Sequence, residues 1–447
     1  MTRGAGPVVI VGAGLSGLAA AVRLAINRIP VTVLEQKPVP GGRAYSYTDA
    51  ATGEKVDNGQ HAMIAGYART LAFLDTIGTR HLLYVQPRPV LPFHHPGRGF
   101  QTMAFPRLPS PVHLLAGILS TGLLASADKV DLLEAGFFLW RNDPDYMDHL
   151  ADCTISEWLD DIGQSPECRR SFWEPLAVSI MNEETSTASA LLFVRTLRTA
   201  FLGHHSNAAL VLPAAGLSDL FAEPAARFIG SRGGIIRCQV DVDAVRFTNG
   251  KAAGVETRTG EHIPASAVIL AVPPHKLHPL LHDPPVDLRL PVADALSWSP
   301  IVSVHLWFDE DVMPGAVLGL IGRRVQWVFN KRKLIPGDRQ GGHLSAVISA
   351  AHAFVGLSSE VLVTLALEDL RSVFGARMPA PSHSVVIREK RATYSSSPAR
   401  ERLRPGNVTS VPGLYLAGDW TATGYPATIE GAIVSGEACA DHILRLS

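Results

Sequence analysis

The 447-residue chain has only four cysteines, and its charged residues form no long run of one sign. The cysteines are scattered, with no CxxC pair among them and no HxxxH pair near them. This argues against both a disulfide framework and a zinc site, and it predicts a reducing, cytoplasmic compartment and no bound metal. Forty Lys and Arg residues against 41 Asp and Glu residues leave a net charge of -1, which predicts no nucleic-acid partner.

Long apolar runs are also missing. No segment reaches the ~20 apolar residues that a helix needs to cross a bilayer. Residues 1–3 and the apolar run that follows them resemble the start of a signal peptide. However, Gly12, Gly14 and Gly17 interrupt this run at the spacing of a dinucleotide-binding turn. We therefore expect a strand and a turn here, and no cleaved signal.

What the chain does have is the composition of a globular protein, with 47% apolar and 18% charged residues. Its length suits two domains. The hydrophobic pattern predicts an α/β fold class, with a first, discontinuous Rossmann-type domain formed by residues 1–85, 206–290 and 395–447. A second, α+β domain would comprise residues 86–205 as a helical layer and residues 291–394 as a sheet.

The expected elements follow from periodicity and turn residues. A strand, a helix and a second strand are expected at 8–11, 15–26 and 31–35. The pattern from 88 to 205 is helical. Later strands are expected at 235–240, 243–245, 268–271, 301–308, 344–349, 384–390 and 414–417, with Asn249-Gly250 as a hairpin turn, a helix at 360–374 and a closing helix from about 427.

The first motif is GxGxxG, formed by Gly12, Gly14 and Gly17 between a strand and a helix. The first glycine permits a tight turn, the second lets the backbone approach a pyrophosphate, and the third lets the helix pack closely on the strand. Glu35 lies 18 residues after Gly17, at the end of the second strand, where a carboxylate accepts hydrogen bonds from ribose hydroxyls. Together these residues predict a dinucleotide site.

Two further segments support this prediction. Gly41-Gly42-Arg43 offers a close backbone approach and a guanidinium that neutralises a phosphate. Near the C-terminus, a buried-type strand ends in Gly418-Asp419. The helix that follows starts near Ala427, and its N-terminal dipole would stabilise negative charge on a reduced flavin.

The order of these motifs, with Asp57-Asn58-Gly59-Gln60-His61 between them and Pro426-Ala427-Thr428-Ile429-Glu430 at the end, resembles the phytoene desaturase and amine oxidase superfamily of FAD enzymes. The resemblance implies that the first domain binds FAD, here without a covalent link. The residues expected to contact FAD are Gly12, Ala13, Gly14, Leu15, Ser16, Gly17, Glu35, Gln36, Gly41, Gly42, Arg43, Gly59, Gln60, His61, Val240, Gly418, Asp419, Ala427, Thr428 and Ile429.

Amine oxidases of this superfamily place a lysine near flavin N5 and often an aromatic residue before the closing helix. An approximate alignment puts Val302 and Thr428 at these positions, which disfavours amine oxidation. Phe172-Trp173-Glu174-Pro175 and the later Leu217-Ser218-Asp219-Leu220-Phe221 look like the hydroxysqualene dehydroxylases of bacterial squalene and hopanoid synthesis. The resemblance implies reductive dehydroxylation of hydroxysqualene to squalene, with hydride supplied by reduced flavin N5.

In such an enzyme an acid protonates the departing hydroxyl. The catalytic candidates are His61, Gln60 and Tyr425, with His61 as the first choice because imidazole titrates near neutral pH. The implied partners are a long apolar isoprenoid substrate and a reductant, either NAD(P)H or a redox protein. Residues 112–127, which lack charge, would form an interfacial helix on the inner face of the membrane, or alternatively an internal wall of the helical layer.

Two other functions remain open at this point. The same fold would serve a desaturase that oxidises a carotenoid-type polyene, the opposite redox direction. Relatives of the fold also include escort proteins that bind prenylated partners without redox chemistry, although Glu35, Arg43 and Asp419 argue against such a binder.

Overall fold

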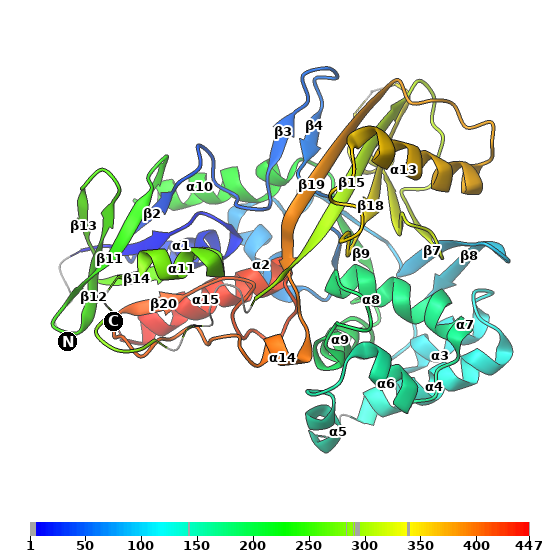
Figure 1. Cartoon of the computed structure of the whole chain (residues 1–447), viewed down its shortest axis with the longest axis horizontal. Coiled ribbons are helices and arrows are strands. Elements are labelled where there is room, and N and C mark those ends of the chain that lie inside the picture. Colours follow the sequence, from blue (N-terminus) through cyan, green and yellow to red (C-terminus); the bar gives the residue numbers. More distant parts are fainter. Residues whose placement is uncertain are drawn as a thin grey trace.

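The computed structural model describes residues 6–141, 144–282, 284–288, 290, 296–337 and 340–446. Residues 1–3, compared above with the start of a signal peptide, lie outside these ranges, and so does the expected domain boundary at residue 291. Figure 1 shows a parallel sheet with its helices at one end of the molecule, and a larger sheet with a helical layer beneath it at the other end. The two parts are connected several times by the chain.

A five-stranded sheet with the order β10-β2-β1-β14-β20 forms the core of the first part. Its strands are Val8–Val11 (β1), Val31–Glu35 (β2), Ile235–Cys238 (β10), Ala267–Leu270 (β14) and Leu414–Leu416 (β20). Every strand pair is parallel, and the strands come from three distant parts of the sequence. This confirms the predicted α/β class with a discontinuous Rossmann-type sheet.

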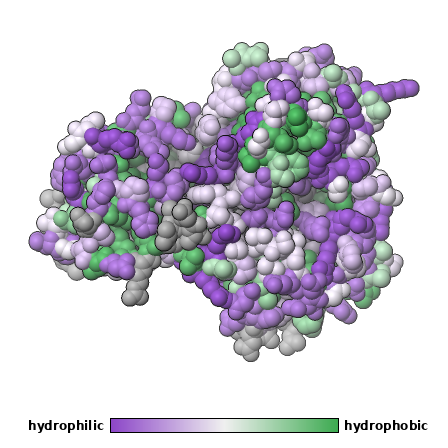
Figure 2. Space-filling model, viewed as in Figure 1, coloured by the Kyte–Doolittle hydropathy of each residue, from purple (hydrophilic) through white to green (hydrophobic). Residues whose placement is uncertain are grey.

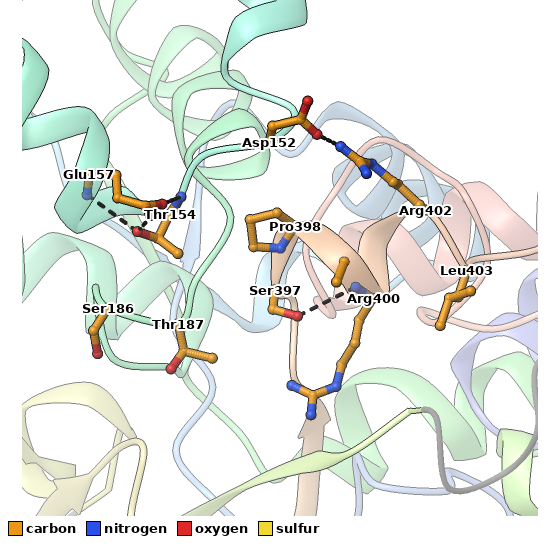
Figure 3. A pocket seen from close by; sticks show the side chains of 11 residues that line it. Asp152, Thr154, Glu157, Ser186, Thr187, Ser397, Pro398, Arg400, Arg402 and Leu403 are labelled. Atoms are coloured by element: carbon orange, nitrogen blue, oxygen red, sulfur yellow. Dashed lines mark hydrogen bonds and ion pairs between the residues drawn. The ribbon is translucent and has the colours of Figure 1, made fainter.

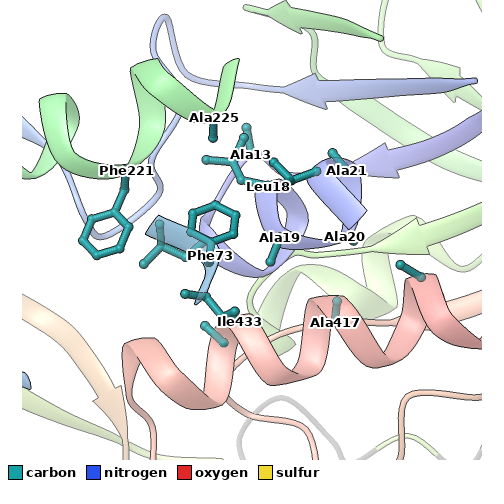
Figure 4. Packing of buried hydrophobic residues seen from close by; sticks show 14 of the residues in the cluster. Ala13, Leu18, Ala19, Ala20, Ala21, Phe73, Phe221, Ala225, Ala417 and Ile433 are labelled. Atoms are coloured by element: carbon teal, nitrogen blue, oxygen red, sulfur yellow. The ribbon is translucent and has the colours of Figure 1, made fainter. Parts of the chain in front are cut away.

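Small residues let two helices pack closely on this sheet. Helix α1 (Leu15–Ile26) contributes Ala19 and Ala20, which lie on its side toward α15 (Ile429–Leu446), the helix that carries Ile433 (Figure 4). A Cβ atom at Gly436 would lie 2.0 Å from the carbonyl oxygen of Ser16, so only glycine permits this approach. The closing helix begins at Ile429, two residues later than the sequence predicted.

The second part contains a seven-stranded sheet with the order β19-β15-β18-β17-β16-β7-β8. Its strands are Val90–His95 (β7), Gly99–Ala104 (β8), Trp298–Phe308 (β15), Val317–Leu320 (β16), Trp327–Asn330 (β17), Gly342–Ile348 (β18) and His383–Tyr394 (β19). Helix α13 (Ser359–Phe374), expected at 360–374, packs on one face of this sheet. The prediction of helix throughout 88–205 is wrong at its start, because β7 and β8 form an antiparallel pair that extends this sheet.

The helical layer begins only after β8. Its helices are Val112–Ser120 (α3), Ser126–Arg141 (α4), Pro144–His149 (α5), Ile155–Asp161 (α6), Pro166–Cys168 (α7), Glu174–Met181 (α8) and Ala190–Leu197 (α9). Buried Trp158, Trp173 and Phe193 form edge contacts with one another at its centre. The same apolar cluster includes Phe93 of β7 and Val347 of β18, so the helices cover one face of the larger sheet.

The remaining elements connect these layers. They are Ser46–Thr48 (β3), Lys55–Asp57 (β4), Met63–Ile64 (β5), Ala68–Ile77 (α2), Leu83–Val85 (β6), Leu210–Pro213 (β9), Glu223–Ser231 (α10), Val242–Thr248 (β11), Lys251–Thr257 (β12), His262–Pro264 (β13), Leu277–Leu280 (α11), Lys331–Leu334 (α12) and Pro398–Glu401 (α14). The predicted hairpin turn between β11 and β12 is confirmed, because Asn249 and Gly250 both have positive φ.

The molecular surface is mostly hydrophilic on the face shown in Figure 2, where an apolar area lies over α13. None of the helices in the described part of the chain has both the length and the hydrophobicity that crossing a bilayer requires.

Candidate functional site

The glycine turn after β1 has the shape that a dinucleotide needs. The Gly12 amide donates to the Leu34 carbonyl at 2.7 Å, which closes the turn against β2. A Cβ atom at Gly17 would lie 2.1 Å from the Gly12 carbonyl oxygen, whereas a Cβ atom at Gly14 would meet no atom within 4 Å. The side of Gly14 is therefore open, and free amides at the start of α1 border it. This turn fits the pyrophosphate of FAD.

Glu35 is fixed beside this turn. Its carboxylate accepts hydrogen bonds from the backbone amides of Ala13, at 2.8 Å, and Lys37, at 2.9 Å. Its carbonyl accepts a third bond from the amide of Val240, which places the predicted adenine contact next to the predicted ribose contact. A carboxylate has about four lone-pair positions, so two remain for ribose hydroxyls. Gln36 follows on the exposed side of the chain.

The Gly41-Gly42-Arg43 segment returns to the same turn. The Gly41 amide donates to the Ala13 carbonyl at 2.8 Å, and both glycines have positive φ. Arg43 donates to the Asp419 carboxylate at 2.6 Å and to the Ala392 carbonyl at 2.7 Å. Burial alone would lower the pKa of Arg43, but the carboxylates of Asp419 and Glu389 together raise it above its usual value. The sequence predicted Arg43 and Asp419 as two separate contacts to FAD, and the fold joins them in one ion pair.

The Gly418-Asp419 turn is held by polar residues that sequence reasoning missed. The Gly418 amide donates to Ser435 Oγ at 2.9 Å, and Arg404 donates to the Asp419 carbonyl at 2.8 Å. The Arg404 side chain is fully buried and pairs with Glu401. A buried arginine that bonds a backbone carbonyl fixes the turn, and with it the Asp419 carboxylate that faces Arg43.

The start of α15 is fixed in a similar way. Thr428 Oγ1 accepts from the Gly431 amide at 3.1 Å, so Ala427 and Thr428 form the turn that precedes the helix. The Glu430 carboxylate accepts from the amides of Arg69 and Thr70, at 3.0 and 2.8 Å, and thereby caps the N-terminus of α2. Glu430 thus has a structural role in joining two helices.

Behind Gly59, Gln60 and His61 lies a buried ion pair. Lys331 of α12 donates to Asp57 Oδ2 at 3.3 Å and to Gln60 Oε1 at 3.1 Å. The side chains of Lys331 and Asp57 are 3% and 4% exposed. Lys331 was not predicted, because it lies 271 positions after Gln60 and only its burial, which the sequence does not display, distinguishes it from a surface lysine.

His61 Nδ1 lies 3.0 Å from the Gly59 carbonyl oxygen. A carbonyl only accepts, so Nδ1 carries the proton and Nε2 keeps its lone pair. Burial lowers the pKa of His61, although the Gly59 carbonyl and Asp57 act in the opposite direction, so the ring is neutral at physiological pH. In this state His61 is a hydrogen-bond acceptor at Nε2, which weakens its predicted role as the acid.

Tyr425 lies before α15, and its ring meets that of Tyr67 edge-on at 6.5 Å. Burial is the main cause that raises the pKa of Tyr425, so its hydroxyl stays protonated at neutral pH. An aromatic residue, Tyr425, therefore does precede the closing helix, and its partner Tyr67 precedes α2; the alignment had considered only Thr428 at this place.

The approximate alignment placed Val302 of β15 at the position of the amine oxidase lysine, but the Val302 side chain does not face the site. Val302 is buried in the apolar cluster with α13, on the far side of the sheet. Its neighbour Ser303 points to the site, because a Cβ atom on Gly59 would lie 3.9 Å from Ser303 Oγ. A lysine does lie beside this segment, but it is Lys331 and comes from another element.

A polar cavity of about 860 Å³ lies between the helical layer and α14 (Figure 3). Thr154 and Glu157 line one side, and Ser397 and Arg400 line the other. The Arg400 amide donates to Ser397 Oγ at 3.4 Å. None of the predicted site residues borders this cavity, and its polar wall does not suit a long hydrocarbon.

Three potential metal ligands also meet on the helical layer. His149 Nε2 lies 3.3 Å from Asp161 Oδ2 and 3.7 Å from Cys153 Sγ. This group was not predicted from the sequence, because Asp161 joins His149 and Cys153 only in the folded chain. The expectation that no metal binds stays a prediction.

Comparison with known proteins agrees with this geometry. Residues 15–444 match the family described as flavin containing amine oxidoreductase. A hydroxysqualene dehydroxylase of Rhodopseudomonas palustris is 32% identical over 445 residues, which cover 97% of each chain. A 15-cis-phytoene desaturase of Synechococcus elongatus is 23% identical and covers 98% of this chain and 95% of its own. The structure of a putrescine oxidase superimposes with a TM-score of 0.74 at 18% identity, over 98% of this chain and 99% of that one.

Proposed function

Because the chain belongs to the flavin-containing amine oxidoreductase family, we propose that this FAD-dependent oxidoreductase converts hydroxysqualene to squalene. The observation that carries this proposal is the 32% identity with a hydroxysqualene dehydroxylase along almost the whole of both chains. The phytoene desaturase is less similar, at 23% identity. Family membership also disfavours a prenyl-binding escort protein without redox chemistry.

We assign FAD to the open space beside Gly14 of the glycine turn. The amides at the start of α1 would bind the pyrophosphate, and Glu35 would accept the ribose hydroxyls. Arg43 and Asp419, paired at 2.6 Å, would lie along the ribityl chain, and the flavin ring would face Gly59-Gln60-His61 and the start of α15. When bound, the reduced cofactor supplies the hydride that replaces the hydroxyl group.

The chain's own residues must bind the alcohol, assist its departure as water and exclude bulk solvent. Tyr425 keeps its proton at neutral pH and is the O–H donor for the departing oxygen. His61, as a neutral ring, accepts a hydrogen bond at Nε2. The buried Asp57–Lys331 pair holds Gln60 in place from behind.

The product test is direct. Holoenzyme is photoreduced under anaerobic conditions and mixed with hydroxysqualene, which removes the need to know the physiological reductant. We expect one squalene per flavin and the return of oxidised-flavin absorbance. The absence of squalene would contradict the proposal, and new conjugated double bonds formed from phytoene by oxidised enzyme would favour the desaturase.

The substrate is long and apolar, and an apolar surface suits its delivery. Seven large apolar side chains on α3 and α4 are between 43% and 57% exposed: Val112, Leu115, Leu119, Val130, Phe137, Phe138 and Trp140. On α3 they recur at the spacing of one helix face. No charged residue occurs between Leu108 and Ala127. We assign this α3–α4 face to the surface of a lipid bilayer, from which the substrate would enter.

Replacing Phe137 and Trp140 together by serine is expected to reduce binding to phosphatidylethanolamine–phosphatidylglycerol vesicles by about tenfold or more, because each buried aromatic contributes roughly 1.5–3 kcal/mol. Cosedimentation measures the bound fraction. Val408→Ser, at a residue 50% exposed away from this face, is the control and should bind as the unchanged protein does. Equal binding of both variants would refute the assignment.

A further inference from the structure

The turn formed by Gly59, Gln60 and His61 presents two complementary polar atoms. Lys331 Nζ lies 3.1 Å from Gln60 Oε1. An ammonium group only donates hydrogen bonds, so the atom that faces it must be the amide oxygen and not the amide nitrogen. The Gln60 Nε2 group then points the other way, where it lies 3.3 Å from the His61 carbonyl. One of its two N–H bonds remains for a ligand.

The next residue, His61, offers a hydrogen-bond acceptor where Gln60 offers a donor. Its Nδ1–H is used by the Gly59 carbonyl, which leaves the Nε2 lone pair for a donor. Both side chains are half-buried, whereas Lys331 and Asp57 behind them are almost fully buried. Consecutive residues of one turn therefore carry a free donor and a free acceptor on partly accessible side chains, while the buried Asp57–Lys331 pair holds Gln60 in place.

A hydroxyl group needs this combination, because its oxygen accepts one hydrogen bond while its hydrogen donates another. A hydrocarbon polyene needs neither, and it would leave both atoms without a hydrogen-bond partner. We infer that Gln60 and His61 form a subsite that recognises the hydroxyl group of the isoprenoid substrate, and that Lys331 is the positioning residue that turns the Gln60 amide toward it. This inference rests on the proposed function, and it adds how the enzyme separates its alcohol from the hydrocarbon product.

The subsite also favours release of the product. Once the hydroxyl has departed as water, squalene offers no partner to either atom. Water can satisfy both, so release of the hydrocarbon restores the hydrogen bonds of the turn.

Binding to oxidised holoenzyme tests the subsite without turnover. The probes are hydroxysqualene and squalene in the same detergent, and the readouts are the perturbation of flavin absorbance and the shift in unfolding temperature. We expect the unchanged protein to bind hydroxysqualene about tenfold more tightly than squalene, as two hydrogen bonds of ordinary net strength imply. Gln60→Glu, which replaces the donor by a second acceptor of the same shape, should reduce this preference to less than about twofold.

Two further variants sharpen the test. His61→Phe removes the acceptor and keeps the ring, so it should weaken binding of the alcohol and leave binding of squalene unchanged; it also decides the matter if Gln60→Glu does not fold. Gln101→Glu, on β8, is the matched control and should keep the full preference. Equal binding of both probes by the unchanged protein, or a tenfold preference retained in both Gln60→Glu and His61→Phe, would overturn the inference.

The outcome is separate from that of the product test. A preference for the alcohol that depends on Gln60, without any squalene formed by photoreduced enzyme, would reject the proposed reaction and keep the hydroxyl subsite. Squalene formation without such a preference would support the proposed reaction and reject the hydroxyl subsite.

Discussion

Replacing Gly14 by alanine is expected to weaken FAD binding about ten- to a hundredfold, while the FAD-free protein keeps its stability to within about 1 kcal/mol. A Cβ atom at this position meets no protein atom within 4 Å, so the fold has room for it. The same space is where the pyrophosphate would approach the backbone, and an added methyl group in a filled site costs about 1–3 kcal/mol. Flavin fluorescence titration and thermal unfolding of the apoprotein measure the two effects.

Gly17→Ala is the informative comparison, because it should act on the fold itself. Its Cβ atom would lie 2.1 Å from the Gly12 carbonyl oxygen and 3.1 Å from the Ala271 side chain. Backbone must move to relieve such a contact, so we expect a loss of more than about 3 kcal/mol in the free energy of unfolding even without FAD. If Gly14→Ala bound FAD normally, the cofactor would lie elsewhere.

Lys331→Met is expected to cost about 3–5 kcal/mol of stability, because it leaves the Asp57 carboxylate buried without its cation. Both side chains are less than 5% exposed. Combining it with Asp57→Asn should recover most of the loss, since the amide oxygen can still accept from Ser46 Oγ and the Leu217 amide, which now bond Asp57 at 2.8 and 3.0 Å. Urea unfolding of the three variants measures this cycle.

Lys55→Met is the matched control for that cycle. Lys55 pairs with Asp219 across the surface, where the two side chains are 49% and 30% exposed, so its removal should cost no more than about 1 kcal/mol. A similar cost for Lys331→Met would mean that the Asp57–Lys331 pair is hydrated.

Some parts of the fold could be read from the sequence because they obey local rules. The strand, glycine turn and helix at residues 8–26 follow from backbone sterics and apolar spacing, and the structure reproduces them residue by residue. By contrast, β7 was predicted as part of a helical region, although it is a strand that contains Pro92. Proline is tolerated there since β16 pairs with β7 only at Phe93 and His94, so no ladder partner is lost at Pro92.

The candidate site also contains residues that the sequence identified and contacts that only the folded chain shows. Spacing along the chain identified Gly12, Gly14, Gly17 and Glu35, because a dinucleotide turn is built from neighbouring residues whose geometry the backbone fixes. The resemblance to FAD enzymes added Gln60 and His61 to the site. Folding alone decided what these residues can do: Arg43 meets Asp419 across 376 positions, and Lys331 sets the orientation of Gln60 across 271. Such pairs depend on how distant elements of the chain pack together, and the direction of a hydrogen bond depends on its partner. The sequence by itself therefore determined the turn that binds the cofactor. The tertiary structure determined which atoms facing the substrate donate hydrogen bonds and which accept them.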